Sequence, residues 1–234
     1  MQRFFVTFPL SIDMTITDID MVHQLTRVLR VAIWEQIVLF MGDGSEMEYE
    51  ITTIDKKSIW LRWVASRVPN TESHKRVTLY QALPNKYEKI EYILQKWVEI
   101  GIARFVFFRS DRSQKLLLSP TKIERFIAIA REALEQCGGV VMPEIAFIER
   151  FPEYTASNPV EMSHVVLDTI WESIRISQYD NLQNMGLWVG PEGGWSDAER
   201  VRMQDNGFIF ARFWERVLRT ETAGIVIGFG FLNA

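Results

Sequence analysis

The chain has 234 residues, of which 47% are hydrophobic and 24% are charged. These proportions are typical of a soluble globular protein with one large domain or two small ones. Its single cysteine, Cys137, excludes an internal disulfide. The formal net charge of −4 gives no support for non-specific nucleic-acid binding, although an acidic protein can still carry a local basic face.

Neither a secretory signal nor a membrane-spanning segment is predicted. The short apolar run after Arg3 is soon followed by Asp13, Asp18 and Asp20, which a signal peptide would not contain. The longest uncharged stretch near the C-terminus, 222–234, is shorter than the roughly 20 residues that a membrane helix needs. We therefore expect a cytoplasmic protein.

The first seventy residues are predicted to form short strands joined by tight turns. Strands are expected at 3–8, 36–41, 47–54 and 59–68, with a short helix inside 20–30. Gly42-Asp43-Gly44 is a strong turn signal between two of these strands. Closely spaced strands of this kind predict a small β-barrel domain over residues 1–72, which ends in the polar segment 69–73.

From residue 73 to residue 234 the pattern changes to alternating strands and helices. Strands are expected at 77–83, 104–108, 144–148, 165–167, 186–189 and 208–213, and helices at 86–100, 121–137 and 220–232. A further helix is predicted after Ser196, because Ser196 and Glu199 have the spacing of a capping box. This alternation predicts an α/β domain with a mostly parallel sheet and helices on both faces.

The turn Gly190-Pro191-Glu192-Gly193-Gly194 is the strongest candidate for a ligand-binding loop. It follows a predicted buried strand and precedes a predicted helix start, so glycines and free backbone N–H groups meet at one place. The loop has neither the P-loop nor the dinucleotide spacing. Glu192 favours a neutral or positively charged ligand over a nucleoside triphosphate. The alternative is a tight turn that binds no ligand.

A second polar stretch lies about twenty residues further on. It reads Arg216-Val217-Leu218-Arg219-Thr220-Glu221-Thr222-Ala223 and is surrounded by apolar sequence. Two such segments in one apolar region suggest a single site built from both. The alternative is an exposed helix start with solvated charges.

Near the N-terminus, Arg3, His23, Arg27 and Arg30 are candidates for a patch that contacts RNA phosphates. The alternative is ordinary surface charge on a small domain. His74 and His164 are isolated and lack metal-ligand spacing, so no metal site is predicted.

Taken in order, these residues resemble a known family. The matching positions are Arg3-Phe4-Phe5, His23, Val28-Leu29-Arg30, Lys86, Lys89, Glu91, Lys96, Glu99, Gly101, Glu132-Ala133, Glu135-Gln136, Gly190 to Gly194 and Arg216 to Ala223. The chain resembles the RsmE family, bacterial methyltransferases that modify N3 of one uridine in small-subunit (16S) ribosomal RNA. The resemblance spans essentially the whole chain, and the two C-terminal motifs are its most specific part.

The resemblance implies a PUA-like RNA-binding β-barrel followed by a SPOUT-type α/β domain with a C-terminal trefoil knot. It also implies S-adenosyl-L-methionine as cofactor, a small-subunit ribosomal RNA or assembled subunit as substrate, and a homodimer. Three loops are implied to hold the cofactor. Their residues are Leu167 and Asp168; Gly190, Pro191, Glu192, Gly193 and Gly194; and Phe213, Val217, Leu218 and Arg219.

For the chemistry, the uracil N3 must lose its proton, and negative charge then spreads onto the uracil oxygens. Arg219, or Arg30 or Arg3 from the first domain, is predicted to stabilise this charge with its planar donors. The sequence does not identify the group that accepts the proton.

Three positions depart from the family pattern. Phe213-Trp214-Glu215-Arg216 replaces the usual L-G-x-R, Cys137-Gly138-Gly139 lacks the usual basic residue, and Trp34-Glu35 replaces the usual Gly-Asp. Two alternative functions remain at this point: another SPOUT RNA methyltransferase, or a non-catalytic RNA-binding assembly factor that keeps the fold.

Overall fold

The computed structural model describes residues 1–151, 162–171, 176–179, 181–213 and 215–233. It divides into two compact units. The first contains Met1–Glu72 together with Leu134–Met142, and the second contains Ser73–Ala133 and Pro143–Ala234. None of the helices within the described residues has the length and apolar character needed to cross a membrane.

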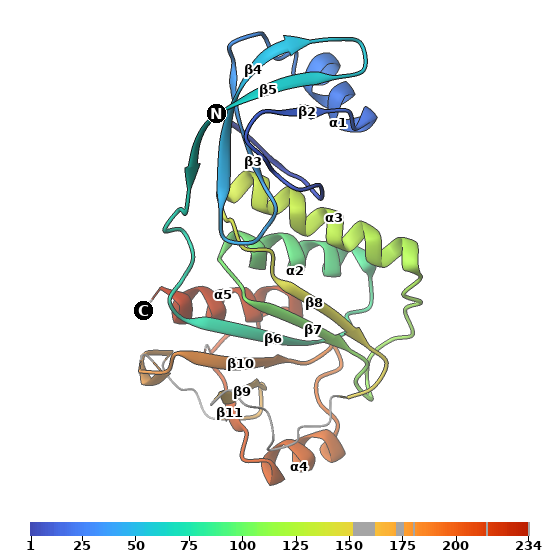
Figure 1. Ribbon diagram of the computed structural model, residues 1–234. Helices are drawn as coiled ribbons and strands as arrows, with labels where there is room; N and C mark the ends of the chain where they lie inside the picture. The colour runs from blue at the N-terminus through green and yellow to red at the C-terminus, as the bar shows by residue number, and fades with distance from the viewer. Residues whose placement is uncertain (152–161, 172–175, 180, 214, 234) are drawn as a thin grey trace. The chain divides into compact units, whose positions relative to one another are not determined.

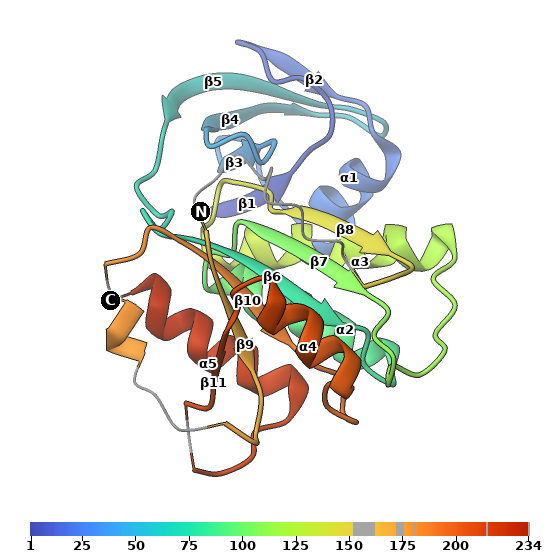
Figure 2. The ribbon, with the colours of Figure 1, turned by 90° about the horizontal axis from the view of Figure 1, so that it is seen from below.

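The first unit is built on a curled sheet of five strands (Figures 1 and 2). In spatial order these are β1 (Gln2–Phe5), β3 (Gln36–Phe40), β4 (Glu46–Ile54), β5 (Ile59–Arg67) and β2 (Met14–Ile16). β1 pairs with β3 in parallel, and the other pairs are antiparallel. Because β1 and β2 are the end strands, the predicted barrel is a curled half-barrel.

A short helical segment closes the core of this half-barrel. Helix α1 (Ile19–His23) continues into a π-helical turn (Gln24–Val28). Met21, Val22 and Leu25 are buried against Tyr49 and Ile51 of the sheet. The helix starts where it does because the Asp18 side chain accepts a hydrogen bond from the Met21 N–H.

The second unit contains a six-stranded sheet in which every pair is parallel. In spatial order the strands are β11 (Ile209–Ala211), β9 (Ser163–Leu167), β10 (Asn184–Val189), β6 (Arg76–Ala82), β7 (Arg104–Phe108) and β8 (Glu144–Ile148). Their near-continuous apolar sequences suit a parallel sheet that is covered on both faces.

Helices cover both faces of this sheet, as the sequence pattern predicts (Figure 1). On one face lie α2 (Tyr87–Glu99), α3 (Pro120–Cys137) and α5 (Thr220–Leu232), and on the other lies α4 (Asp197–Asp205). A 3₁₀ turn spans Ile176–Tyr179. The core beneath α4 contains Trp188, with Tyr80 stacked on it at a centroid distance of 4.1 Å.

Two strands of the structure differ from the prediction. The strand expected at 208–213 is limited to Ile209–Ala211, and the strand at Met14–Ile16 was not predicted. Three residues are too few to give a periodic signal, and Met14–Ile16 becomes a strand by pairing with distant β5. The trefoil knot stays a prediction, and Trp214 lies outside the described residues.

Candidate functional site

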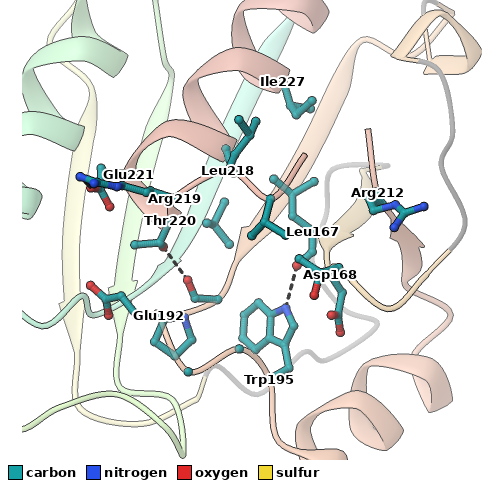
Figure 3. A pocket seen from close by; sticks show the side chains of 18 of the residues that line it. Leu167, Asp168, Glu192, Trp195, Arg212, Leu218, Arg219, Thr220, Glu221 and Ile227 are labelled. Atoms are coloured by element: carbon teal, nitrogen blue, oxygen red, sulfur yellow. Dashed lines mark hydrogen bonds and ion pairs between the residues drawn. The ribbon is translucent and has the colours of Figure 1, made fainter. Parts of the chain in front are cut away.

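A cavity of about 680 Å³ lies in the second unit, at the carboxyl ends of β9, β10 and β11 (Figure 3). In open parallel α/β sheets this edge is where ligands bind. Three loops line it: the one after Leu167, the one from Gly190 to Gly194, and the one from Arg212 to Thr220. Its volume is suited to a ligand of cofactor size.

All residues that the sequence assigned to cofactor loops line this cavity. They are Leu167, Asp168, Gly190, Pro191, Glu192, Gly193, Gly194, Phe213, Val217, Leu218 and Arg219. The structure therefore brings the three predicted loops to one place. Their role in binding a cofactor stays a prediction.

Two hydrogen bonds tie the three loops to one another, and both are drawn in Figure 3. The Trp195 Nε1–H donates to the Leu167 carbonyl at 3.0 Å, which joins the first loop to the second. The Thr220 hydroxyl donates to the Gly190 carbonyl at 2.6 Å, which joins the second to the third. Buried Gln81 donates in turn to the Thr220 oxygen at 3.0 Å.

Close packing explains why glycine is needed at position 190. A Cβ atom at Gly190 would lie 3.2 Å from the Trp195 ring, closer than nearly all Cβ contacts in proteins. The indole, which is 1% exposed, therefore sits directly against the backbone of the loop.

Helix α4 begins immediately after this loop with the capping box that the sequence predicts. The Ser196 hydroxyl accepts from the Glu199 N–H at 3.1 Å, and the Glu199 carboxylate accepts from the Ser196 N–H at 2.8 Å. The other oxygen of Glu199 accepts from the Asp111 N–H at 3.0 Å. The carboxylate of Glu199, a residue that is 2% exposed, thus accepts two backbone hydrogen bonds at the base of the loop.

The segment after β7 is hydrogen-bonded to the same loop and to the start of α4. The Asp111 carboxylate accepts from the Ser196 hydroxyl at 2.5 Å, and Arg112 Nη1 donates to the Gly193 carbonyl at 3.1 Å. A Cβ at Gly193 would lie 3.3 Å from the Arg112 Cβ. Arg112 lines the cavity, and its guanidinium has further donors beyond the one that Gly193 accepts.

Charged side chains from α2 and from both C-terminal motifs meet at another part of the wall. Lys89 Nζ lies 2.5 Å from Glu192 Oε1 and 3.6 Å from Glu221 Oε2. Burial on its own raises the pKa of Glu192. The hydrogen bond from Lys89 and those from the backbone N–H groups of Glu192 and Asn85 outweigh this effect, so the pKa lies below its ordinary value. Glu192 is therefore ionised at neutral pH.

Asp168, in the first loop, is held by hydrogen bonds of both its side chain and its backbone. Its carboxylate accepts from Arg200 Nε at 2.8 Å, and its own N–H donates to the Ala211 carbonyl at 3.1 Å. Only 4% of the Asp168 side chain is exposed. Arg200 also reaches Asp197 at 2.9 Å, so α4 is held to the end of β9 by an ion-pair network.

The four basic residues that were assigned to RNA contact near the N-terminus belong to the first unit. Arg3 is ion-paired with Glu46, donates to the Gly139 carbonyl at 3.0 Å and lies over the Phe40 ring. His23, Arg27 and Arg30 are exposed. The structure places Arg3 within internal contacts, and the RNA-binding and catalytic roles of all four stay predictions.

Several cavity residues were not singled out as site residues from the sequence. The main ones are Lys89, Arg112, Trp195, Arg200 and Arg212, whereas Glu221 belongs to the second polar stretch that the sequence already suggested for the site. One signal could have found Arg112: Arg109-Ser110-Asp111-Arg112 directly follows a predicted buried strand, and strand ends of a parallel sheet meet at one edge. Lys89 is one of the positions that match the family, but it lies on a predicted helix, where a lysine is ordinarily solvated, so it was not assigned to the site.

Comparison with known proteins agrees with this geometry. A family model described as an RNA methyltransferase domain matches residues 71–228. The chain is 30% identical over 163 residues to ribosomal RNA small subunit methyltransferase E of Mesomycoplasma hyopneumoniae, covering 68% of this chain and 70% of that protein. This chain belongs to the methyltransferase E family.

Other members of the family match over nearly the full length. Ribosomal RNA small subunit methyltransferase E 2 of Borreliella burgdorferi is 27% identical, and the match covers 94% of this chain and 90% of that protein. The crystal structure of the methyltransferase E from Neisseria gonorrhoeae bound to S-adenosyl methionine has a TM-score of 0.86 at 27% identity, covering 97% of this chain and 95% of that one. The half-barrel and the parallel α/β unit are thus the family's architecture.

Proposed function

We propose that this protein transfers a methyl group from S-adenosyl-L-methionine to N3 of a uridine in small-subunit ribosomal RNA. The observation that carries the proposal is the cavity closed by three tied loops in a chain of the methyltransferase E family. The N3 position and the choice of uridine rest on the resemblance described above. The two alternatives, another SPOUT RNA methyltransferase and a non-catalytic RNA-binding assembly factor, have no comparable observation in their favour.

The residues present fit the proposed cofactor. The cavity is of suitable size, and Gly190 and Gly193 let the Trp195 ring and the Arg112 side chain pack directly against the loop that lines it. S-adenosyl-L-methionine carries a sulfonium centre whose methyl group is the electrophile. Glu192 and Glu221 place two carboxylates in the wall beside Lys89, and the same wall also contains Arg112, Arg216 and Arg219.

The chain's own groups would act by binding and charge stabilisation. Leu167, Leu218 and Ile227 provide an apolar wall, and the loop backbone supplies hydrogen-bonding groups. Arg219 and Arg112 provide planar donors that can hydrogen-bond the uracil oxygens as negative charge develops on them. In a duplex the N3 edge is paired, so the uridine must be unpaired or flipped out when it reacts.

We propose a homodimer as the working form, with RNA bound by exposed cations of the first unit. His23, Arg27 and Arg30 are the residues assigned to this contact. Binding through such phosphate contacts weakens as salt concentration rises.

The function is tested by methyl transfer. The purified chain is incubated with radiolabelled S-adenosyl-L-methionine and small ribosomal subunits that lack this modification, and labelled nucleotides are identified by mass spectrometry. The expected product is uridine methylated at N3. Label on another base or on ribose would replace the proposal with a different SPOUT activity, and cofactor binding without transfer to any ribosomal RNA would contradict the assigned substrate.

A further inference from the structure

Residues 32–35 of the first unit form a tight turn that is fixed to the sheet. The Glu35 N–H donates to the Ala32 carbonyl at 3.2 Å, and the Trp34 N–H donates to the Ile51 carbonyl at 2.8 Å. Trp34 is the third residue of this turn and has a φ of 75°. A positive φ at that position favours glycine, and a bulky side chain there is strained.

The strain is not offset by burial of the Trp34 side chain. Trp34 is 67% exposed, and its neighbour Ile33 is 46% exposed. Arg30, in the same loop, also has a positive φ, 54°, just after the helical segment ends, where glycine is again the preferred residue. The loop thus twice places a large, exposed side chain where the backbone favours glycine. Such outliers point to a function for the side chain.

The cations beside Trp34 are not neutralised by neighbouring carboxylates. Between Met21 and Trp34 the sequence contains no aspartate or glutamate. Arg27 and Arg30 are exposed and make no hydrogen bond or ion pair with the part of the chain that the structure describes. The carboxylate of Glu35 turns back to accept from the Ala32 N–H at 3.0 Å.

The spacing of these groups suits a short stretch of unpaired RNA. Arg30 and Trp34 are four positions apart in the sequence, so their Cα atoms lie within about 14 Å of each other. An exposed aromatic ring next to free guanidinium groups is the combination that binds single-stranded nucleic acid, by base stacking and phosphate contact. We propose that Trp34 stacks on an unpaired base of the substrate RNA while Arg27 and Arg30 contact the flanking phosphates. The proposal rests on RNA being the substrate, as proposed above.

The test uses the full chain and a fluorescently labelled single-stranded RNA of about 12 uridines, within the size range of such sites. Trp34→Gly removes the ring and relieves the turn. We expect RNA affinity to fall about 5- to 100-fold, while Tm stays within about 3 °C of the original or rises. Arg27→Gln and Arg30→Gln should each lower the salt dependence of binding by about 0.7 in slope.

Trp60→Ala is the matched control. Trp60 is 53% exposed on β5, outside the turn at 32–35, and the nearby Arg62 is ion-paired with Glu50. Its RNA affinity should equal that of the original chain. Undiminished RNA binding by Trp34→Gly would overturn the proposal, as would a change in its oligomeric state in sedimentation, which would assign Trp34 to a protein contact.

A cofactor titration separates this proposal from the proposed function. Trp34→Gly should bind S-adenosyl-L-methionine as tightly as the original chain, because Trp34 lies outside the residues that line the cavity. Loss of stacking in a chain that methylates no ribosomal RNA would refute the proposed function and support the RNA contact. Full methylation together with unchanged RNA binding by Trp34→Gly would support the proposed function and overturn the RNA contact of Trp34.

Discussion

Among the cavity arginines, Arg219 has a particularly exposed side chain, at 85%, and its nearest carboxylate, Glu221, is 4.0 Å away. By contrast, Arg200 is held by two carboxylates. An arginine with so few fixed contacts can hydrogen-bond a substrate without first breaking internal bonds. This contrast makes Arg219 the better candidate for stabilising charge on the uracil.

Arg219→Ala should therefore reduce turnover at least about 100-fold, the usual effect of removing one donor to a developing oxyanion. Cofactor affinity should change little, because the loop backbone is unaltered. Arg219→Lys should restore only part of the rate, since it keeps the charge but not the planar donors. Single-turnover methylation and calorimetric cofactor binding measure the two effects. Arg125→Ala, on the surface of α3, is the control, and equal turnover in both alanine variants would rule out this role.

His164 gives the residue-level prediction on stability. Burial lowers its pKa from 6.5 to about 4. The Trp188 Nε1–H donates to its Nδ1 at 2.9 Å, and its ring stacks on Phe208. Between pH 6.5 and pH 4 the unfolded chain binds a proton that the folded chain does not. The free energy of unfolding therefore falls as pH is lowered through this window, by up to about 3 kcal/mol.

His164→Gln keeps an acceptor for Trp188 but cannot titrate in this range, so this part of the pH dependence should disappear. Urea unfolding at pH 7 and pH 5 measures it. His74→Gln, at an exposed position, is the control and should keep the full dependence. An unchanged difference between the two pH values in His164→Gln would show that other groups cause it.

At the scale of elements, α5 depends on glycines that allow another helix to approach. A Cβ at Gly228 would lie 2.2 Å from the Trp97 ring of α2, and one at Gly224 would lie 3.2 Å from it. Trp97 is 1% exposed and cannot move aside without opening the core. Gly224 and Gly228 are poor helix formers, but their lack of a side chain makes the close contact between α2 and α5 possible.

Gly228→Ala should destabilise the protein by about 1 to 3 kcal/mol, the usual effect of overpacking, despite the better helix propensity of alanine. Denaturant unfolding measures this change. Val226→Ala, at a position of the same helix that is 52% exposed, should stay within about 0.5 kcal/mol. A stabilised Gly228→Ala would mean that propensity outweighs packing in α5.

The difference between local signals and packing against distant segments explains how far the sequence could predict this protein. Periodicity located α2 and the long strands, and the capping box located the start of α4, because these signals are local. The short β2 and the cavity position of Lys89 depend on segments distant in sequence, which local patterns do not encode. The polar stretches 190–194 and 216–223 were found because such residues in an apolar region are a local signal, whereas the loop after Leu167 and the cofactor role of all three loops were implied by the family resemblance.

At the scale of the whole molecule, the proposed homodimer gives a further prediction. One chain has a mass of 27.3 kDa. Sedimentation equilibrium of the purified chain should give twice that mass, and S-adenosyl-L-methionine should raise Tm by an amount that grows with its concentration. A species of single-chain mass with full methylation activity would contradict the dimer as the working form.

In the proposed site, three loops linked by the hydrogen bonds of Trp195 and Thr220 bind S-adenosyl-L-methionine. Calorimetric titration of the cofactor into the original chain, Thr220→Val and Thr222→Val tests it most directly. Thr220→Val removes the bond to the Gly190 carbonyl and should weaken binding about 5-fold, the value of one hydrogen bond. Thr222 does not line the cavity, so its variant should bind normally. Absence of binding by the original chain, or equal binding by both variants, would contradict the claim.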